Sequence, residues 1–117
     1  MRLVARVLAG IVAAEHLYIL ILEMFAWTTP RARRAFGTTP EFAAQTATMA
    51  ANQGLYNGFL AAGLIFALAL GSQPFILYFL GCVIVAGVYG GYTVKPSIYV
   101  VQALPAALAF TATVLGH

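Results

Sequence analysis

Four long apolar segments dominate the sequence and leave few folds open to it. They span about residues 3–27, 40–70, 75–94 and 98–115, and short breaks rich in proline, glycine and charge separate them. The chain is 62% hydrophobic and 8% charged, whereas an ordinary soluble domain carries about 25% charge. A chain of 117 residues is too short to bury so much apolar surface in its own core. The sequence therefore predicts an all-α integral membrane protein with one domain and the lipid bilayer as its solvent.

The breaks predict how the four helices connect. Residues 28–40 form the one stretch that looks solvated, and Thr39, Pro40 and Glu41 at its end have the pattern of a helix start. The turns at residues 71–74 and 95–97 are short, which makes the helices on either side antiparallel neighbours. Pro105 lies inside the fourth segment and removes one backbone hydrogen bond. We expect an up-down four-helix bundle with a kinked fourth helix.

The first segment, LVARVLAGIVAAEHLYILILEMFAW, carries Glu15, His16 and Glu23. At about 100° per residue, these three side chains all leave one side of the helix. Ionisable groups inside a membrane usually face the interior of a bundle or a water-filled cavity. The polar groups and the length of the run also distinguish it from a cleaved signal peptide. We interpret the segment as a retained transmembrane helix, and its three polar residues as a candidate acid/base cluster.

An antiparallel arrangement collects nearly all intramembrane polar residues in the half of the bilayer next to the loop at residues 28–40. The candidate ligand-binding residues in that half are Asn52, Gln53, Tyr56, Asn57, Tyr89 and Gln102. The other half is almost pure hydrocarbon. This asymmetry predicts a pocket that opens toward the basic loop and closes beyond mid-depth. Its expected residues are Glu15, His16, Glu23, Asn52, Gln53, Asn57 and Gln102.

Structural interpretations of the same residues stay open. The acids and the imidazole also suit a buried hydrogen-bond network that fixes helix packing, the amides suit helix–helix contacts, and Tyr89 suits an interfacial anchor. One histidine and two glutamates are a possible ligand set for a metal, but Glu15 and His16 are adjacent in sequence, and no metal site is predicted. Small residues at four-residue spacing indicate close helix packing, either within the bundle or at a dimer interface. They are Gly54, Gly58, Ala62, Gly87 and Gly91.

The basic residues lie at the ends of the apolar segments. They form no basic, aromatic-interleaved surface, so nucleic acid is not an expected partner. The loop that carries Arg31, Arg33 and Arg34, together with Lys95, outweighs the basic residues on the opposite side. The positive-inside rule then favours cytoplasmic loops with both termini outside, and insertion in both orientations is the alternative. The arginine cluster is interpreted as a topology signal and headgroup contact, with attraction of an anionic ligand as the alternative.

Four stretches carry a family resemblance: AAEHLYILILEMFAW, ANQGLYNGFLAAGL, GVYGGYT and VQALPAALA. They resemble the small four-helix bacterial membrane proteins filed as domain of unknown function thirteen-oh-four. The patterns EH-x-YI-x7-W and NQG-x-YNG-x-LA are the specific ones, and the resemblance covers nearly the whole chain. It implies a multi-pass protein of the bacterial cytoplasmic membrane and carries no assigned activity. The layout is more distantly similar to DoxX-like proteins, which are linked to membrane redox complexes.

Three functions fit these features. The first is a membrane-embedded pocket that binds a small or amphiphilic molecule, a lipid included, and acts on it by acid/base chemistry. The second is a small proton-coupled transporter that works as a homodimer, because a mid-depth glutamate on the first of four helices is also the layout of the small multidrug-resistance exporters. The third is a non-catalytic subunit of a membrane complex. The sequence identifies no cofactor and does not decide whether the protein is an enzyme.

Overall fold

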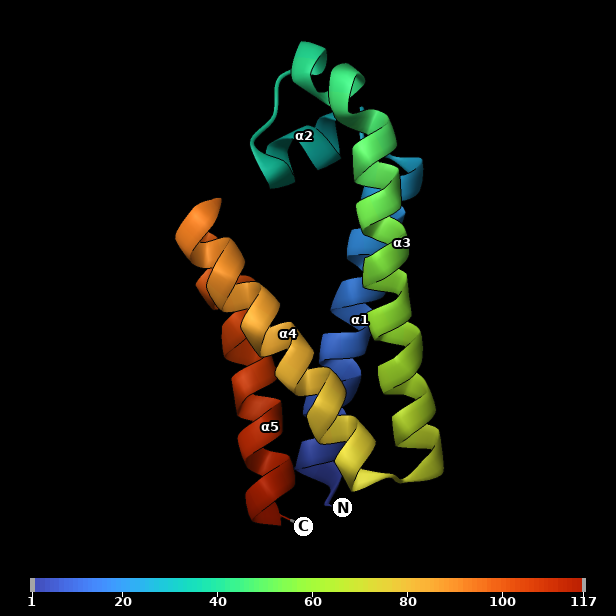
Figure 1. The fold of residues 1–117 in the computed structure, drawn as a ribbon, viewed down its shortest axis with the longest axis vertical. Coiled ribbons are helices and arrows are strands. Elements are labelled where there is room, and N and C mark those ends of the chain that lie inside the picture. The colour runs from blue at the N-terminus through green and yellow to red at the C-terminus, as the bar shows by residue number, and fades with distance from the viewer. Residues whose placement is uncertain (1, 117) are drawn as a thin grey trace. The chain divides into compact units, whose positions relative to one another are not determined.

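The computed structural model describes residues 2–116, and its regular elements are all helices. In chain order they are α1 (Leu3–Phe25), α2 (Pro30–Phe36), α3 (Pro40–Leu70), α4 (Gln73–Thr93), the π-helical turn η1 (Tyr99–Ala103) and α5 (Leu104–Gly116) (Figure 1). Four stretches are long and apolar enough to cross a membrane: Leu3–Phe25, Pro40–Leu70, Gln73–Thr93 and Tyr99–Gly116. The all-α class and the four candidate spans are confirmed. Their stacking as an up-down bundle stays a prediction.

The loop at residues 28–40 contains a helix, α2, that the hydropathy pattern did not predict. Its local signals are clear in the structure. Thr29 Oγ1 accepts a hydrogen bond from the backbone N–H of Ala32 at 3.4 Å, and Pro30 occupies the first turn. Gly37 ends the helix with φ at 70°, a conformation that glycine adopts without steric cost. Two helical turns are too short for a hydrophobic period to become visible, which is why only the caps mark α2.

The fourth span begins with a π-helical turn rather than a regular α-helical one. The backbone N–H of Leu104 donates to the carbonyl of Tyr99, five residues earlier. Pro105 follows directly; it has no N–H, and its ring excludes the carbonyl of Val101 from the α-helical ladder. A widened turn next to the proline is the local response to that lost bond. The structure shows this turn at the position where the sequence predicts a kink, and the kink itself stays a prediction.

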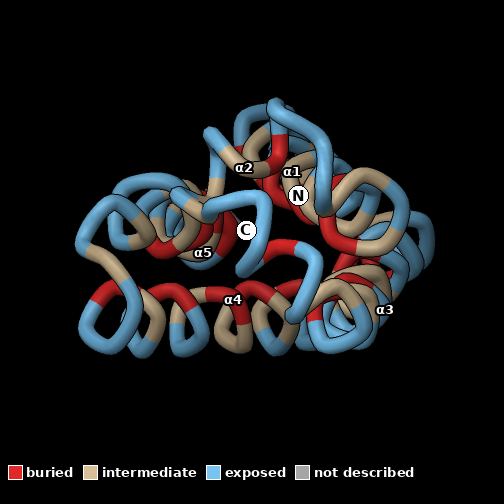
Figure 2. Tube along the Cα trace, turned by 90° about the horizontal axis from the view of Figure 1, so that it is seen from above, coloured by how far each residue is buried: buried red, intermediate tan, exposed pale blue. Residues whose placement is uncertain are grey.

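The chain divides into two compact units. We call Glu15–Phe59 the polar unit, and the described residues before and after it the apolar unit. The apolar unit has a continuous buried core, formed by Ala9, Val12, Ala13, Leu64, Ala67, Ile76, Leu80, Val83, Ala106 and Ala109. In Figure 2 the buried positions of α4 lie along one side of the helix, with exposed positions opposite. Many core residues are alanines, so the helix backbones approach one another closely, as is typical of membrane helices.

Glycines mark the closest helix contacts in each unit. A Cβ atom at Gly87 of α4 would lie 2.6 Å from the backbone nitrogen of Ala103 in η1. In the polar unit, a Cβ at Gly54 of α3 would lie 2.7 Å from Met24 Cγ of α1. Gly54 and Gly87 thus serve packing within the chain, whereas Ala62 is exposed and the dimer alternative stays a prediction.

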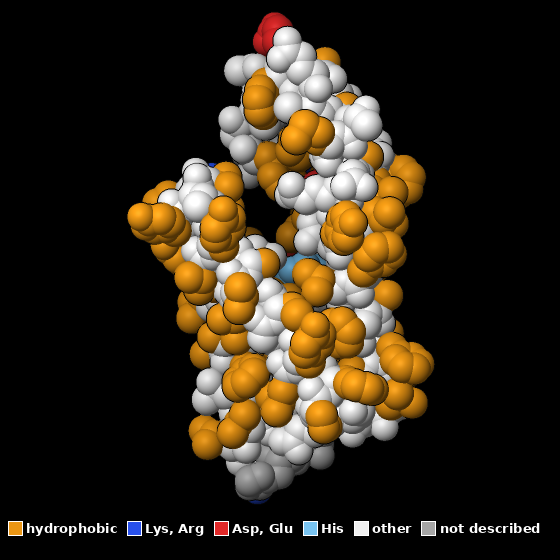
Figure 3. All heavy atoms as spheres, in the orientation of Figure 1, with side chains coloured by type: hydrophobic (Ala, Val, Ile, Leu, Met, Phe, Trp, Pro, Cys, Tyr) orange, Lys and Arg blue, Asp and Glu red, His pale blue; other side chains and the backbone are white. Residues whose placement is uncertain are grey.

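Large apolar side chains remain exposed on all four candidate spans. Phe66 on α3 and Val85 on α4 are examples, with exposed fractions of 61% and 69%. Figure 3 shows hydrophobic side chains over much of the visible surface. Soluble monomers rarely expose apolar surface on this scale, whereas a lipid-embedded protein presents such a surface to the acyl chains. The exposed faces thus agree with the membrane class that composition predicts.

Gly87→Ala is expected to destabilise the protein by about 1–3 kcal/mol, the usual cost of overpacking, because the added methyl overlaps backbone atoms of Ala103. Gly81 in the same helix is the matched control, since a Cβ there meets nothing within 4 Å. Gly81→Ala should leave stability unchanged or raise it slightly, because alanine is the better helix former. Thermal unfolding in detergent, followed by helical circular dichroism, measures both variants. Equal stability of the two would contradict the close contact between α4 and η1.

Candidate functional site

Glu23 is the buried polar centre of the polar unit. Its side chain, near the C-terminal end of α1, is 1% exposed. Each carboxylate oxygen accepts a hydrogen bond from an amide of α3: Oε2 from Gln53 Nε2 at 2.8 Å, and Oε1 from Asn57 Nδ2 at 2.6 Å. The structure therefore brings together three of the residues that the sequence assigns to one polar pocket.

Local helix geometry explains why these two amides reach the same carboxylate. Gln53 and Asn57 are four residues apart on α3, so their side chains leave the same face of the helix. Gly54 lies between them and lets α3 approach α1, since a Cβ there would lie 2.9 Å from Glu23 Cβ. Gly58, one turn later, makes room for Leu20, whose Cδ1 would lie 2.5 Å from an added Cβ. Gly54 and Gly58 thus allow a short distance between α1 and α3. At that distance the amides of Gln53 and Asn57 reach the carboxylate of Glu23.

The partners that hold Glu23 are neutral donors. They satisfy part of the hydrogen-bonding capacity of the carboxylate without supplying a positive charge. An ionised carboxylate has about four lone-pair sites, of which the two amides use two. The group thus retains the capacity to accept a proton or a ligand donor, while its orientation is fixed from two sides. Such an arrangement suits a positioned acid or base.

Glu15 and His16 lie about two turns earlier on α1. The His16 side chain is 1% exposed. Glu15 is partly buried, and its Oε1 has no hydrogen-bond partner among residues 2–116. A buried polar atom without a partner costs about 1–3 kcal/mol, so such atoms in native proteins call for an explanation. The role of Glu15 in a site stays a prediction.

Of the remaining predicted residues, two belong to the polar unit and two to the apolar unit. Asn52 and Tyr56 are exposed on α3, and the ring of Tyr56 contacts Phe59 edge-on at 5.6 Å. Tyr89 and Gln102 belong to the apolar unit, Gln102 within η1. Their roles stay predictions. Among residues 2–116 no group of three or more His, Cys, Asp or Glu side chains is placed to hold a metal ion.

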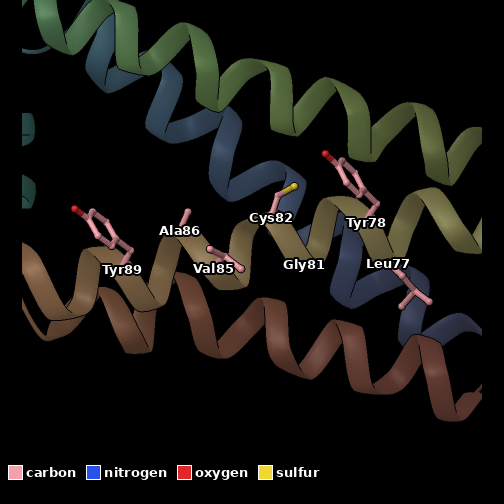
Figure 4. A pocket seen from close by; sticks show the side chains of 7 residues that line it. All are labelled: Leu77, Tyr78, Gly81, Cys82, Val85, Ala86 and Tyr89. Atoms are coloured by element: carbon pink, nitrogen blue, oxygen red, sulfur yellow. The ribbon is translucent and has the colours of Figure 1, made fainter.

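Tyr89 lines a shallow apolar groove on α4 (Figure 4). The groove residues all come from this one helix, and Tyr89 is 71% exposed. They are Leu77, Tyr78, Gly81, Cys82, Val85, Ala86 and Tyr89. The lining of this groove is almost entirely apolar and offers little polar chemistry.

Contacts around α2 complete the polar unit. Trp27 Nε1 donates to Thr46 Oγ1 at 3.1 Å, and the Trp27 ring packs against Phe36 with 4.9 Å between centroids. Arg31 Nη1 donates to Tyr18 Oη at 3.0 Å, and this hydrogen bond raises the pKa of the Arg31 guanidinium, which is charged at any physiological pH. No periodicity could have indicated these pairs, because they join residues 19 and 13 positions apart through the geometry of a loop.

Asn57→Leu is expected to lower the free energy of unfolding by about 1–3 kcal/mol, because Glu23 Oε1 would stay buried without its donor. Asn52→Leu is the matched control, since Asn52 is exposed on the same helix. In a Glu23→Met background, Asn57→Leu should lower the free energy of unfolding by less, because no buried carboxylate is then left without its donor. Thermal unfolding of the four combinations gives this double-mutant cycle. An equal cost of Asn57→Leu in both backgrounds would show that the two side chains do not interact.

Comparison with known proteins agrees with the resemblance seen in the helix motifs. Residues 10–114 match a family model described as "Protein of unknown function (DUF1304)". The chain is also 32% identical over 113 residues to the uncharacterized protein YpaA of Lactococcus lactis subsp. lactis (strain IL1403), a match that covers 93% of this chain and 95% of that protein. No solved structure matches the chain. Since the match extends over nearly its whole length, the chain belongs to the DUF1304 family of proteins of unknown function.

Proposed function

We propose that this protein spans the bacterial cytoplasmic membrane and binds a small or amphiphilic molecule at its glutamate cluster, with a carboxyl group as acid or base. The observation that carries the proposal is the Glu23 carboxylate, which is 1% exposed and held by two amides. It lies in a helix long and apolar enough to cross a bilayer. Ionisable groups in such helices mark functional sites more often than not.

The energetics disfavour a purely structural role for the two acids. Glu15 lies at the middle of the 23 residues of α1, and a charged side chain at the centre of a span costs about 2.5–3.5 kcal/mol. Hydrogen bonds between membrane helices contribute about 0.6 kcal/mol each on average. Two such bonds hold Glu23, and Oε1 of Glu15 has no partner in residues 2–116. Uncharged amides alone would hold α1 and α3 together at a lower cost, so packing does not account for the carboxyls.

The two acids have different environments, which supports a division of roles. Glu23 is oriented by fixed donors, so it is the better-positioned acid or base. Glu15 has an oxygen without a hydrogen-bond partner among residues 2–116 and is the better first contact for a donor group of the ligand, such as a hydroxyl or an amine. The imidazole of His16 lies on the same helix between them in sequence order, and a proton can pass between groups of this type.

A small dimeric proton-coupled transporter is the second candidate. The observation that favours it is the position of Glu15 at the midpoint of α1, where one carboxyl can bind either a proton or a substrate. Proton-linked flux in liposomes that is lost in Glu15→Gln would favour transport over a static binding site.

We further propose that the loop with Arg31, Arg33 and Arg34 faces the cytoplasm, as the positive-inside rule favours. A green fluorescent protein fused after residue 117 should then be dark, and alkaline phosphatase at the same position should be active, because the C-terminus would lie outside. The reverse pattern would overturn the orientation and leave the binding proposal untouched.

Native mass spectrometry of protein released from gently solubilised membranes tests the binding proposal. We expect a co-purifying small molecule with the wild type that is lost in Glu23→Gln and Glu15→Gln. Glu41→Gln is the matched control, since Glu41 is exposed in the first turn of α3. Infrared spectra of wild type and Glu23→Gln at different pH values would identify the protonated carboxyl directly. An empty wild-type protein, or a ligand retained in both site variants, would overturn the proposal.

A further inference from the structure

A second set of polar contacts lies in the polar unit where α2 meets α1. Arg31 is in the first turn of α2 and donates to the hydroxyl of Tyr18, on α1, at 3.0 Å. Tyr18 is 45% exposed, and Arg31 is exposed as well. α2 lies outside the four candidate spans, whereas Tyr18 lies within one of them. This hydrogen bond therefore links a candidate span to the helix of the loop that follows it.

The position of Arg31 is set by a folded helix rather than by a mobile loop. Thr29 and Gly37 cap α2 at its two ends. Ala32, the residue after Arg31, is fully buried. Trp27 packs against Phe36 and donates to Thr46, which ties the helix to α3. Because α2 is capped at both ends and packs through Ala32 and Phe36, the backbone from which Arg31 reaches Tyr18 has a defined position.

The pair presents hydrogen-bond donors and one positive charge. Tyr18 Oη accepts from Arg31, which leaves the hydroxyl hydrogen of Tyr18 available to donate. The guanidinium has five N–H groups, of which this bond uses one. A phenol that accepts from a cation is also a stronger donor, because hydrogen bonds in a chain polarise one another. The partner of Arg31 is neutral, so this contact leaves its charge available.

We propose that Arg31 and Tyr18 form a binding site for a phosphate-type oxyanion, supplied by the headgroup of an anionic phospholipid. Guanidinium and hydroxyl donors match the several acceptor oxygens of a phosphate. Exposed apolar neighbours on α1, Leu17 and Ile21, provide a surface for the acyl chains; their exposed fractions are 41% and 50%. This site goes beyond the proposed function and does not depend on Glu23.

Lipid binding counted by native mass spectrometry tests the site, with phosphatidylglycerol and phosphatidylcholine as probes. Arg31→Gln should weaken phosphatidylglycerol binding roughly tenfold, as expected for loss of a hydrogen bond to a charged group. Tyr18→Phe should weaken it roughly threefold to fivefold, since it removes one neutral donor. Arg34→Gln is the matched control, because it removes the same charge from an exposed position of the same helix. It should change the affinity less than about twofold, since water and salt screen an exposed charge.

Two outcomes would overturn the site. The first is equal weakening by Arg31→Gln and Arg34→Gln with no effect of Tyr18→Phe, which would mean that the arginines act as diffuse charge. The second is equal affinity for the two lipids. Inorganic phosphate, added as a competitor, identifies the source of the anion. If phosphate displaces the lipid, the site binds oxyanions and a free anion can occupy it. If phosphate does not displace the lipid, the site requires the phospholipid headgroup.

Two further measurements keep the test decisive if a variant folds poorly. Trp27 is the one tryptophan of the sequence and packs against α2, so its emission reports whether α2 keeps its place in each variant. Arg31→Lys retains the charge but lacks the fork of donors, and should bind phosphatidylglycerol more weakly than the wild type. Glu23→Gln should leave lipid affinity unchanged, which separates failure of this site from failure of the proposed function.

Discussion

Every polar group inside an apolar medium must find its partner within the protein, and this requirement accounts for most of the structure. Helices satisfy their own backbone, which is why they are the regular elements of a chain with so little charge. Side-chain hydroxyls follow the same rule: Thr113 Oγ1 donates to the carbonyl of Ala109 at 2.8 Å, one turn earlier on its own helix. Pro105 breaks the rule locally, and the preceding turn widens so that Leu104 bonds to Tyr99.

The candidate site applies this requirement to a carboxyl group. Gly54 and Gly58 allow α3 to approach α1, and the amides of Gln53 and Asn57 then reach both oxygens of Glu23. The residue that departs from the requirement is Glu15, whose Oε1 lacks a partner among residues 2–116. Packing explains the contacts of Glu23 but not the presence of a second acid at the middle of the helix. Glu15 therefore adds to the support that the held carboxylate of Glu23 gives to our binding proposal.

Our two proposals place sites of opposite ligand preference in the polar unit. The glutamates favour protons, cations and hydrogen-bond donors, whereas Arg31 and Tyr18 favour oxyanions. Both sites involve α1, and in the second one Tyr18 lies within a candidate span whereas Arg31 lies outside it.

The sequence alone determined the helical class, the four candidate spans and the family, because hydropathy, helix caps and short turns act between near neighbours along the chain. It also singled out Glu23, Gln53 and Asn57 by their polar character in apolar surroundings and by the four-residue spacing of the amides. Only the tertiary structure decided that these amides, rather than Asn52 one position away, face the acid, because a rotation of about 100° per residue changes the face that meets α1. It likewise decided the contacts of α2, since Trp27 with Thr46 and Arg31 with Tyr18 depend on the path of a loop that no periodicity specifies.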